Sequence, residues 1–533
     1  MRKKIFSVLL LLISLLVITS SLSAQVLNEG TFKFAKTLGL IDAAYVDSAD
    51  LNMLTEKAII EVLKNLDPHS TYISAKDVKE MNEPLIGNFE GIGIQFNLLR
   101  DTIIIIEPIP GGPSEKVGLR AGDRIIKING EKVSGVKLST TGVRTRLMGP
   151  KGTKVNINVF RKGEKDILEF NIVRDKIPIT SLDASYMLDK KTGYIKLNKF
   201  GATTIKEFSD AVDSLKKNKM QDLVLDLRSN GGGYMLAATE LADKFFSDKK
   251  LLVYLIGRKT PRQDYNSKGN GNLSKARLVV LTDEGSASAS EIFAGAIQDW
   301  DRGIILGRRS FGKGLVQQGF SLTDGSMIRL TIARYFTPAG RSIQSPYNEG
   351  YDKYMANFYK RFSDGEMITA DSVHFPDSLK YKTLINKRSV FGGGGIMPDV
   401  FVAADTSNYS DYYRKLVSKG VINTFALEYF DKNRASLTSR FKVFDDFRKQ
   451  FEFSEDDIQS FIRKGEDEGI KFEQSQFDVS KKEMLLVLKG LVAINIWQTN
   501  EYFQIINEND KVIENALKII SDNNTYNKLL GNQ

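Results

Sequence analysis

The chain of 533 residues contains no cysteine and only two histidines, His69 and His374. The absence of thiols excludes disulfides, a cysteine nucleophile, iron–sulfur ligation and thiolate zinc sites. The two histidines are far apart in the sequence, which excludes an HExxH zinc helix, and we expect no metal site. An enzyme with this composition would work mainly with Ser, Thr, Lys, Asp, Glu, Tyr or backbone groups.

The chain has no large excess of charged or of apolar residues. Hydrophobic residues make up 42% and charged residues 26%, which is typical of a soluble globular protein and excludes both wholesale disorder and a polytopic membrane protein. The length corresponds to three or four domains of about 150 residues. No basic cluster is interleaved with aromatic residues, so we expect no nucleic-acid binding.

Residues 1–24 have the pattern of a secretory signal. Residues 2–4 are basic, and residues 5–18 form an apolar run of 14 residues, shorter than the about 20 that span a bilayer. Small residues favour cleavage after Ser23 or Ala24; an uncleaved anchor is the alternative. We therefore predict export to the periplasm or cell envelope, where a chain without cysteine cannot mispair under oxidation. Removing the three basic residues lowers the net charge from +10 to +7, which still allows weak peripheral attraction to anionic lipid.

The hydrophobic pattern divides the remaining chain into four regions. Residues 25–85 have mainly helical spacing, and residues 86–175 alternate between β-branched strands and turns. From 176 to 402, short apolar strands alternate with helical segments, which indicates an α/β core. Within that core, residues 346–387 show little periodicity and are predicted as an insertion or flap. Residues 403–533 have helical periodicity, and we predict a helical C-terminal extension.

A glycine-containing loop, Gly91-Ile92-Gly93-Ile94, precedes an apolar strand. Such a loop can turn several N–H groups toward a carboxylate, and the neighbouring strand edge can pair with an extended peptide. Four residues of this kind by themselves are more often an ordinary turn. Together with residues 114–130 (SEKVGLRAGDRIIKING), however, the loop resembles a PDZ domain. This resemblance implies that a C-terminal peptide binds between the strand after the loop and a helix near residues 141–147.

Ser288 lies at the start of a predicted helix that follows the apolar run Leu278–Leu281. Ser288 and Glu291 have the spacing of a capping box, and most such serines only cap. Alternatively, a hydroxyl beside the free N–H groups and the dipole of a helix N-terminus can be a nucleophile, because those groups stabilise a developing oxyanion. The segment alone leaves both interpretations open.

Lys313 lies between two glycines after another predicted strand. Residues 307–313 fit the GxxxxGK of a phosphate loop, but Gly314 stands where a magnesium-binding Ser or Thr is needed, so we do not expect nucleotide binding. A lysine among glycines and apolar residues can lose its hydration, which lowers its pKa and lets it act as a base.

A third candidate segment is the glycine triplet at residues 231–233, which ends an apolar strand. Glycines allow a close approach of the backbone to a substrate, and their N–H groups can point toward a carbonyl oxygen. The alternative is a flexible turn between the strand and the next helix.

Seven segments in this order resemble the C-terminal processing peptidases, also called tail-specific proteases of peptidase family S41. They are Leu66-Asp67-Pro68-His69-Ser70, the PDZ segment, Gly193-Tyr194-Ile195, residues 226–233 (DLRSNGGG), residues 285–292 (GSASASEI), Phe311-Gly312-Lys313-Gly314 and residues 394–399 (GGIMPD). The likeness covers roughly residues 50–402. It implies a multi-domain α/β protein whose ClpP/crotonase-like protease core carries an inserted PDZ domain.

The resemblance also implies roles for individual residues. Ser288 would be the nucleophile, Lys313 the general base 25 positions later, and Gln317 the residue that orients the lysine. The backbone N–H groups of Ala289 and Gly233 would bind the oxyanion. No cofactor is needed, and the PDZ segment would select substrates by their free, apolar C-termini.

Two other interpretations stay open at the level of sequence. One is a catalytically inactive envelope scaffold that only binds protein tails through its PDZ domain. The other is a Ser-His-Asp hydrolase that uses His69 or His374. The resemblance is also compatible with activation by an adaptor protein and with an oligomer. It implies that movement of the PDZ domain against the core can gate activity.

Overall fold

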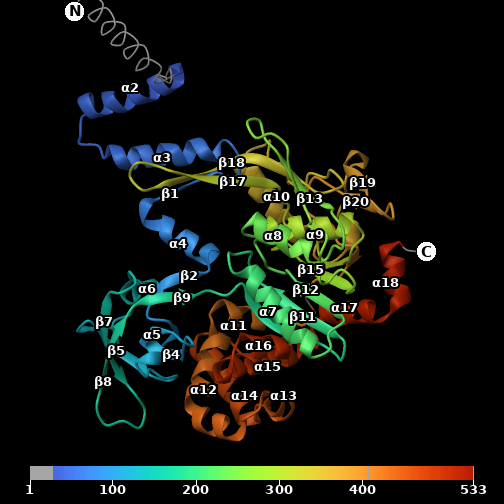
Figure 1. The fold of residues 1–533 in the computed structure, drawn as a ribbon. Helices are drawn as coiled ribbons and strands as arrows, with labels where there is room; N and C mark the ends of the chain where they lie inside the picture. Colours follow the sequence, from blue (N-terminus) through green and yellow to red (C-terminus); the bar gives the residue numbers. More distant parts are fainter. Residues whose placement is uncertain (1–27, 406, 532–533) are drawn as a thin grey trace, which may run out of the picture. The chain divides into compact units, whose positions relative to one another are not determined.

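The computed structural model of the protein describes residues 28–405 and 407–531 (Figure 1). The predicted leader lies outside these residues. Among them, no helix is both long enough and apolar enough to traverse a membrane. The chain separates into two units, residues 1–66 and residues 67–533.

The described part of the first unit consists of two helices, α2 (Glu29–Ala44) and α3 (Leu51–Lys64). Both begin at a side-chain cap, because Asn28 accepts a hydrogen bond from Thr31 N and Asp50 accepts one from Met53 N. No residue of α2 is buried, and Leu63 is the buried residue of α3. The expected helical character of this region is confirmed.

The second unit begins with a strand and a helix, whereas residues 25–85 were expected to be mainly helical. β1 (Thr71–Ile73) is a strand, and α4 (Ala75–Ile86) follows it. Next, β2 (Asn88–Gly91) pairs antiparallel with β9 (Asp175–Pro178). The two strands flank the PDZ segment in the sequence and pair with each other. The segment is therefore an insertion whose entry and exit strands lie side by side.

The inserted segment is a small sheet of antiparallel strands closed by a helix. Its strand order is β3-β4-β5-β7-β8, with β6 paired to β5. Val143 and Leu147 of α6 (Thr140–Leu147) pack into the interior of this sheet. The other elements are β3 (Ile94–Leu99), β4 (Thr102–Pro108), α5 (Pro113–Lys116), β5 (Arg124–Ile128), β6 (Glu131–Lys132), β7 (Lys154–Phe160) and β8 (Leu168–Val173).

The core of the second unit is a six-stranded sheet in the order β10-β11-β12-β15-β16-β21. The pairs from β11 to β21 are parallel, and β10 joins antiparallel. Parallel strands need crossover connections, which explains the alternation of strands and helices in the sequence. The strands are β10 (Leu182–Met187), β11 (Thr192–Leu197), β12 (Asp222–Asp226), β15 (Leu278–Thr282), β16 (Ile304–Gly307) and β21 (Val400–Phe401).

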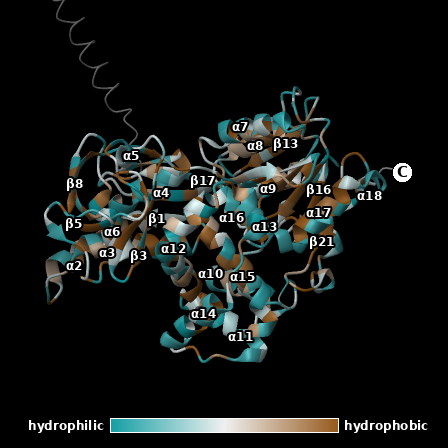
Figure 2. Cartoon of the chain, turned by 90° about the horizontal axis from the view of Figure 1, so that it is seen from below, coloured by the Kyte–Doolittle hydropathy of each residue, from teal (hydrophilic) through white to brown (hydrophobic). Residues whose placement is uncertain are grey.

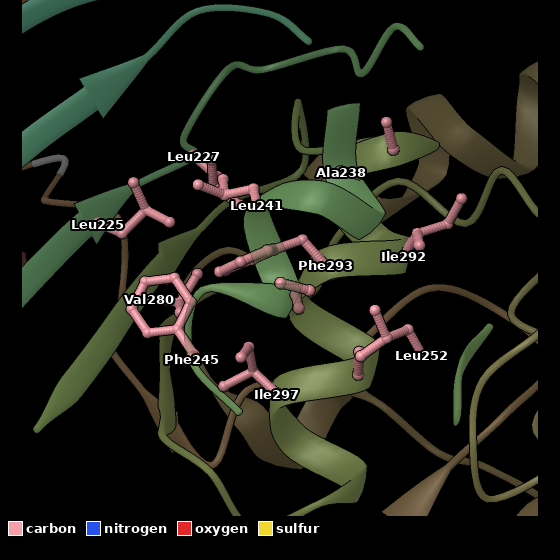
Figure 3. Packing of buried hydrophobic residues seen from close by; sticks show 14 of the residues in the cluster. Leu225, Leu227, Ala238, Leu241, Phe245, Leu252, Val280, Ile292, Phe293 and Ile297 are labelled. Carbon is pink, nitrogen blue, oxygen red and sulfur yellow. The ribbon is translucent and has the colours of Figure 1, made fainter. Parts of the chain in front are cut away.

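One face of this sheet is covered by crossover helices, and the other by the C-terminus of the chain. Leu225 and Val280 face α7 (Thr204–Lys217), α8 (Met235–Asp243) and α9 (Ala289–Asp299), as Figure 3 shows for α8 and α9. On the opposite face, Val224 and Val279 pack against α17 (Lys511–Ser521) and α18 (Asn523–Leu530). β16 and α17 carry mainly hydrophobic residues where they adjoin (Figure 2). The last segment of the predicted extension is therefore part of the core.

A second sheet carries β17 and β18, the strands that follow Lys313. Its order is β1-β18-β13-β14, and β17 pairs with β18 as an antiparallel hairpin. Through β1, the segment around His69 is held next to this hairpin. The strands are β13 (Leu251–Ile256), β14 (Gln263–Asn266), β17 (Leu315–Ser321) and β18 (Met327–Phe336).

The predicted insertion at residues 346–387 contains a helix that is anchored beside the Lys313 loop. In α10 (Tyr351–Ser363), Phe358 packs on Phe311 with ring centroids 4.8 Å apart. Arg361 of the same helix is buried and donates to the carbonyl oxygens of Ser310 and Arg309. The rest of the insertion has the short strand β19 (Lys380–Lys382), which pairs with β20 (Ser389–Phe391).

Between the core and α17, the chain forms a bundle of helices with its own hydrophobic interior. Phe425 and Phe461 belong to this interior, and their rings lie 5.2 Å apart. The helical expectation for the C-terminal region is confirmed. The helices are α11 (Asp411–Ser418), α12 (Val421–Arg440), α13 (Phe444–Gln450), α14 (Glu455–Asp467), α15 (Gln474–Ile496) and α16 (Thr499–Ile506).

Candidate active site

Ser288 occupies a sharp turn between β15 and α9. Its φ is +55° and its ψ −112°, a conformation that is costly for a residue with a side chain and that is found mostly at functional sites. Its backbone N–H donates to the Glu291 carboxylate at 2.8 Å, and its carbonyl oxygen accepts from Glu291 N at 2.9 Å. The side chain is partly exposed. The turn thus presents the hydroxyl at the N-terminus of a buried helix.

The glycine triplet passes directly against this turn. A Cβ added to Gly232 would lie 2.7 Å from Ala287 O and 2.8 Å from Ala289 N, so only glycine allows this approach. Buried Asn230 holds the two segments together, because its carbonyl oxygen accepts from Ala287 N and from the Ser290 hydroxyl. The triplet and the Ser288 turn are one packed unit.

Two backbone N–H groups of that unit are available to a ligand. In the described part of the chain, neither Ala289 N nor Gly233 N donates a hydrogen bond to a protein acceptor, whereas Gly232 N donates to the Asn230 side chain. Gly233 has a φ of +144°, and an added Cβ would lie 2.1 Å from Phe200 O. These N–H groups belong to the two residues for which the family resemblance implies the role of oxyanion donors.

Lys313 lies on the loop between β16 and β17, at residues 308–314. Its side chain is half-buried, and its pKa is lowered from 10.5 mainly by burial and further by the positive charge of Arg329. The negative charges of Glu291 and Asp67 act in the opposite direction. Within the described residues, its amino group makes no hydrogen bond or ion pair, which is the state expected of a lysine that can serve as a base.

The loop of Lys313 is tied to the helix of Ser288 through Glu291. The backbone N–H of Lys313 donates to the same Glu291 oxygen, Oε2, that accepts from Ser288 N. Gly312 N and the Ser310 hydroxyl donate to the other oxygen. The structure therefore brings the two predicted catalytic segments together around one buried carboxylate.

Gln317 lies on β17, and its side-chain nitrogen faces Leu315 O at 3.4 Å and the Thr331 hydroxyl at 3.3 Å. Thr331 in turn donates to the Asp67 carboxylate at 3.0 Å. These contacts connect Gln317 to Asp67, whose charge acts on Lys313. A direct role of Gln317 in orienting the lysine stays a prediction.

The segment 67–70, one of the seven that carry the family resemblance, lies near Lys313, whose charge acts on His69. Asp67 accepts hydrogen bonds from the backbone N–H groups of His69 and Ser70. The His69 pKa is lowered to about 4 by burial and then by the Lys313 charge, against the effect of Asp67. His69 is therefore neutral near pH 7, and its Nε2 lies 3.3 Å from the Tyr354 hydroxyl. His374, between α10 and β19, is exposed.

The Gly91–Ile94 loop borders a separate apolar groove in the PDZ segment. A cavity of about 230 Å³ lies between β3 and α6 and is lined by apolar side chains that include Ile94, Phe96 and Leu147. Gly93 has a φ of +74°. In the described residues, Ile92 N and Gly93 N have no protein acceptor. These features fit a site for the carboxylate and the last side chain of a peptide.

Three family models match the chain. Residues 191–349 match peptidase family S41, residues 91–172 match the PDZ domain, and residues 412–498 match a family of unknown function. The first match contains Ser288, Lys313 and Gln317, and the second contains the Gly91–Ile94 loop.

Several of the similar proteins are named carboxy-terminal processing proteases. The carboxy-terminal-processing protease of Bartonella bacilliformis is 36% identical over 353 residues, which are 64% of this chain and 80% of that protein. Carboxy-terminal processing protease CtpB of Bacillus subtilis is 37% identical over 318 residues, 58% of this chain and just under two thirds (65%) of the relative's length. A solved photosystem II D1 C-terminal processing protease is 31% identical, with 58% of this chain and 89% of that chain covered and a TM-score of 0.34.

The fold is thus a mixed α/β protease core with an inserted PDZ domain and helical terminal segments. With this organisation and this level of identity over four fifths of a relative, the chain belongs to the carboxy-terminal processing proteases of peptidase family S41.

Two residues at the site were not singled out from the sequence as site residues. In the sequence, Glu291 has only the spacing of a capping box, and Tyr335 on β18 belongs to no motif. The Tyr335 hydroxyl lies 2.6 Å from Lys313 O and 3.1 Å from Ser288 O. No local pattern marks a tyrosine in a β-hairpin as a partner of a loop, because that contact exists only after the strands have paired.

Proposed function

We propose that the chain is an exported serine endopeptidase that recognises the C-terminal tails of its substrates through its PDZ domain and cleaves with Ser288 and Lys313. One observation carries the proposal: the Ser288 turn, the Lys313 loop and the glycine triplet, from three distant parts of the sequence, are packed together. Nucleophile, base and oxyanion donors must meet in this way for acyl transfer.

In the proposed reaction, neutral Lys313 takes the proton of the Ser288 hydroxyl while the Oγ attacks the scissile carbonyl carbon. The N–H groups of Ala289 and Gly233 hold the resulting oxyanion; one such donor is typically worth about 3 kcal/mol. Lys313 returns the proton to the leaving amine as the peptide bond breaks. Lys313 then takes a proton from a water molecule, whose oxygen attacks the acyl carbon, and returns that proton to Ser288 Oγ as the ester bond of the acyl-enzyme breaks.

The PDZ groove would supply substrate selection. A free C-terminal carboxylate fits the open N–H groups of Ile92 and Gly93, and an apolar last side chain fits the cavity between β3 and α6. The proposed location outside the cytoplasm rests on the leader pattern of residues 1–24. Substrates would then be envelope proteins with exposed tails.

The test is cleavage of a peptide with a free apolar C-terminus by purified wild type, Ser288→Ala and Lys313→Ala. Each variant should lose at least about 1,000-fold in kcat while it keeps its thermal unfolding temperature. Lys250→Ala is the matched control, because Lys250 is a half-buried lysine over Trp300 near the other end of α9. Full activity of either variant would refute the dyad, and inactive wild type that fails to label with an active-site serine probe would favour the scaffold interpretation.

A second candidate base is favoured by the position of His69, whose pKa is affected by Lys313. His69 could take the serine proton only in its neutral form, which is the form it has near pH 7. The variant His69→Ala distinguishes His69 from Lys313 as the general base. Retained activity would leave Lys313 as the base, whereas loss of activity in His69→Ala together with retained activity in Lys313→Ala would establish a histidine mechanism.

A further inference from the structure

Glu291 is fully buried at the start of α9, and its carboxylate accepts four hydrogen bonds. Oε2 accepts the backbone N–H groups of Ser288 at 2.8 Å and Lys313 at 2.9 Å. Oε1 accepts Gly312 N at 2.7 Å and the Ser310 hydroxyl at 2.6 Å. All four partners are donors, and an ionised carboxylate has about four acceptor sites, so the ionised form satisfies every contact.

Tyr335 makes the complementary contacts on the carbonyl side of the same two peptides. The residue is 1% exposed, and its hydroxyl lies 2.6 Å from Lys313 O and 3.1 Å from Ser288 O. Both neighbours are acceptors, and a hydroxyl has one proton, so it donates to one carbonyl at a time. The hydroxyl thus bridges the backbones of Ser288 and Lys313 from the β18 side.

We propose that Glu291 and Tyr335 are positioning residues that set the distance between the serine and the lysine by holding the backbone of both residues at once. Glu291 holds the two N–H groups, and Tyr335 holds the two carbonyl oxygens. The inference rests on the proposed Ser288 and Lys313 dyad and deepens it, because it names the groups that assemble the dyad from two separate loops.

Helix capping does not account for these contacts. A cap requires a bond to Ser288 N, whereas three of the four donors to Glu291 come from residues 310–313 of the other loop. A buried carboxylate is costly, because burial disfavours its charge; here burial raises the Glu291 pKa to about 7 in spite of the four hydrogen bonds. The Glu291 carboxylate joins the Ser288 turn to the Lys313 loop, and this role explains why a charged group is buried there.

The same carboxylate also affects the lysine electrostatically. The groups whose charges act on the Lys313 amino group are Glu291 on α9, Arg329 on β18 and Asp67 before β1, and His69, which also faces the lysine, is neutral near pH 7. Glu291 stabilises the ammonium form and so raises the Lys313 pKa. Since Lys313 works in its neutral form, removal of the Glu291 charge lowers the lysine pKa and moves the acidic limb of the activity profile to lower pH.

The experiment compares Glu291→Gln and Tyr335→Phe with wild type in the full chain, with a peptide substrate that has a free apolar C-terminus. In Glu291→Gln, an NH2 group replaces one acceptor oxygen, the two donors on that oxygen lose their acceptor, and kcat should fall about 100-fold, as expected for a displacement of the order of 1 Å. Tyr335→Phe removes a single hydroxyl and should lower kcat about tenfold. KM should change less than about twofold in both, because the tail-binding groove is untouched.

The matched control is Tyr526→Phe. Tyr526 is also buried, and its hydroxyl also contacts backbone of the core sheet, at Leu278 N and O, but it lies on α18 at the opposite end of β15 from Ser288. It should keep wild-type kcat. The pH profile of kcat/KM is the readout that a purely structural role would not move, and the acidic limb should shift down in Glu291→Gln alone.

The outcomes separate this inference from the proposed function. Wild-type activity that Ser288→Ala does not abolish would refute the dyad itself. If Ser288→Ala is inactive, then wild-type kcat in folded Tyr335→Phe, or losses equal to those in Tyr526→Phe, would overturn the positioning role. If Glu291→Gln does not fold, the comparison of Tyr335→Phe with Tyr526→Phe still tests the positioning role. The two measurements are kcat and the rate at which a serine-reactive probe labels Ser288.

Discussion

The proposed peptide groove and the proposed catalytic loops of this protease differ in the interactions that shape them. The groove between β3 and α6 is a cavity of about 230 Å³ with mainly apolar walls, including Ile92, Ile94 and Leu147. The catalytic loops meet around buried polar groups, the Glu291 carboxylate and the Tyr335 hydroxyl, each in contact with both loops. Apolar packing has no preferred direction, whereas hydrogen bonds fix both distance and angle.

This difference suits the two tasks. A groove that accepts many protein tails needs area and volume, and its affinity changes gradually as apolar contacts are added or removed. A nucleophile and a base need fixed positions, since a misplacement of about 1 Å can cost 100-fold in rate. We therefore expect small changes at the catalytic loops to affect kcat steeply, and changes in the groove to affect KM moderately.

After the substitutions of Ser288 and Lys313 themselves, the largest effect should come from Gly232→Ala. The added Cβ would meet Ala287 O and Ala289 N at 2.7 and 2.8 Å, so either the triplet or the Ser288 turn must move and the oxyanion donors separate. Loss of one such donor costs about 100- to 1,000-fold in kcat. Steady-state kinetics on a tail peptide should show this fall with little change in KM.

Gly118→Ala is the control for backbone strain in that experiment. Gly118 has a φ of +87°, close to the +96° of Gly232, but a Cβ there meets nothing within 4 Å. Both variants bear the strain of a positive φ, and only Gly232→Ala bears the collision. Equal losses of activity in the two would show that strain, and not the position of the loops, limits catalysis.

The next effect in size is the pH dependence, which should differ between cleavage by the wild-type protein and peptide binding to the groove. The Lys313 pKa is below its usual 10.5, and the lysine works unprotonated, so kcat/KM should rise with pH up to that pKa, about tenfold per unit on the acidic side. Binding of the same peptide to Ser288→Ala, measured by fluorescence anisotropy, should be nearly constant from about pH 6 to 9, because the peptide carboxylate stays ionised throughout. A flat kcat/KM profile would contradict a lysine base.

The smallest effect should follow from Ile94→Ala in the groove. Loss of part of one apolar wall should raise KM for a peptide with an apolar C-terminus about tenfold, with kcat unchanged. Ile167→Ala is the matched control, since Ile167 is 51% exposed in the same domain and does not line the groove. If Ile94→Ala lowers kcat and leaves KM unchanged, the groove acts on catalysis and the comparison between the regions fails.

Local motifs marked the candidate segments of the site, and the resemblance to a family suggested their roles. The run around Ser288, the glycines around Lys313 and the glycine triplet each require an unusual backbone, and such requirements are visible in the residue types. The structure brings these segments together and leaves Ala289 N and Gly233 N without protein acceptors. The individual catalytic roles remain predictions that the variants above test.

Other features had no local signature. Tyr335 reaches the two loops only because β18 pairs with β17 directly after Lys313. The segment 346–387 lacks periodicity, yet its helix α10 is held by Arg361 on the carbonyl oxygens of residues 309 and 310. Its contacts are to a distant loop, so the pattern within the segment carries little information about them.

The sequence by itself indicated the class of the protein and its candidate residues through motifs that resemble a known family, while periodicity and glycine positions predicted the division into regions, because all of these are local properties. Only the tertiary structure decided how the loops of Ser288 and Lys313 are held together, and that α17 and α18 close the open face of the core sheet. Both depend on contacts between residues that are far apart in the chain. Whether such contacts form is decided by the shared burial of apolar surface and of polar groups that need partners.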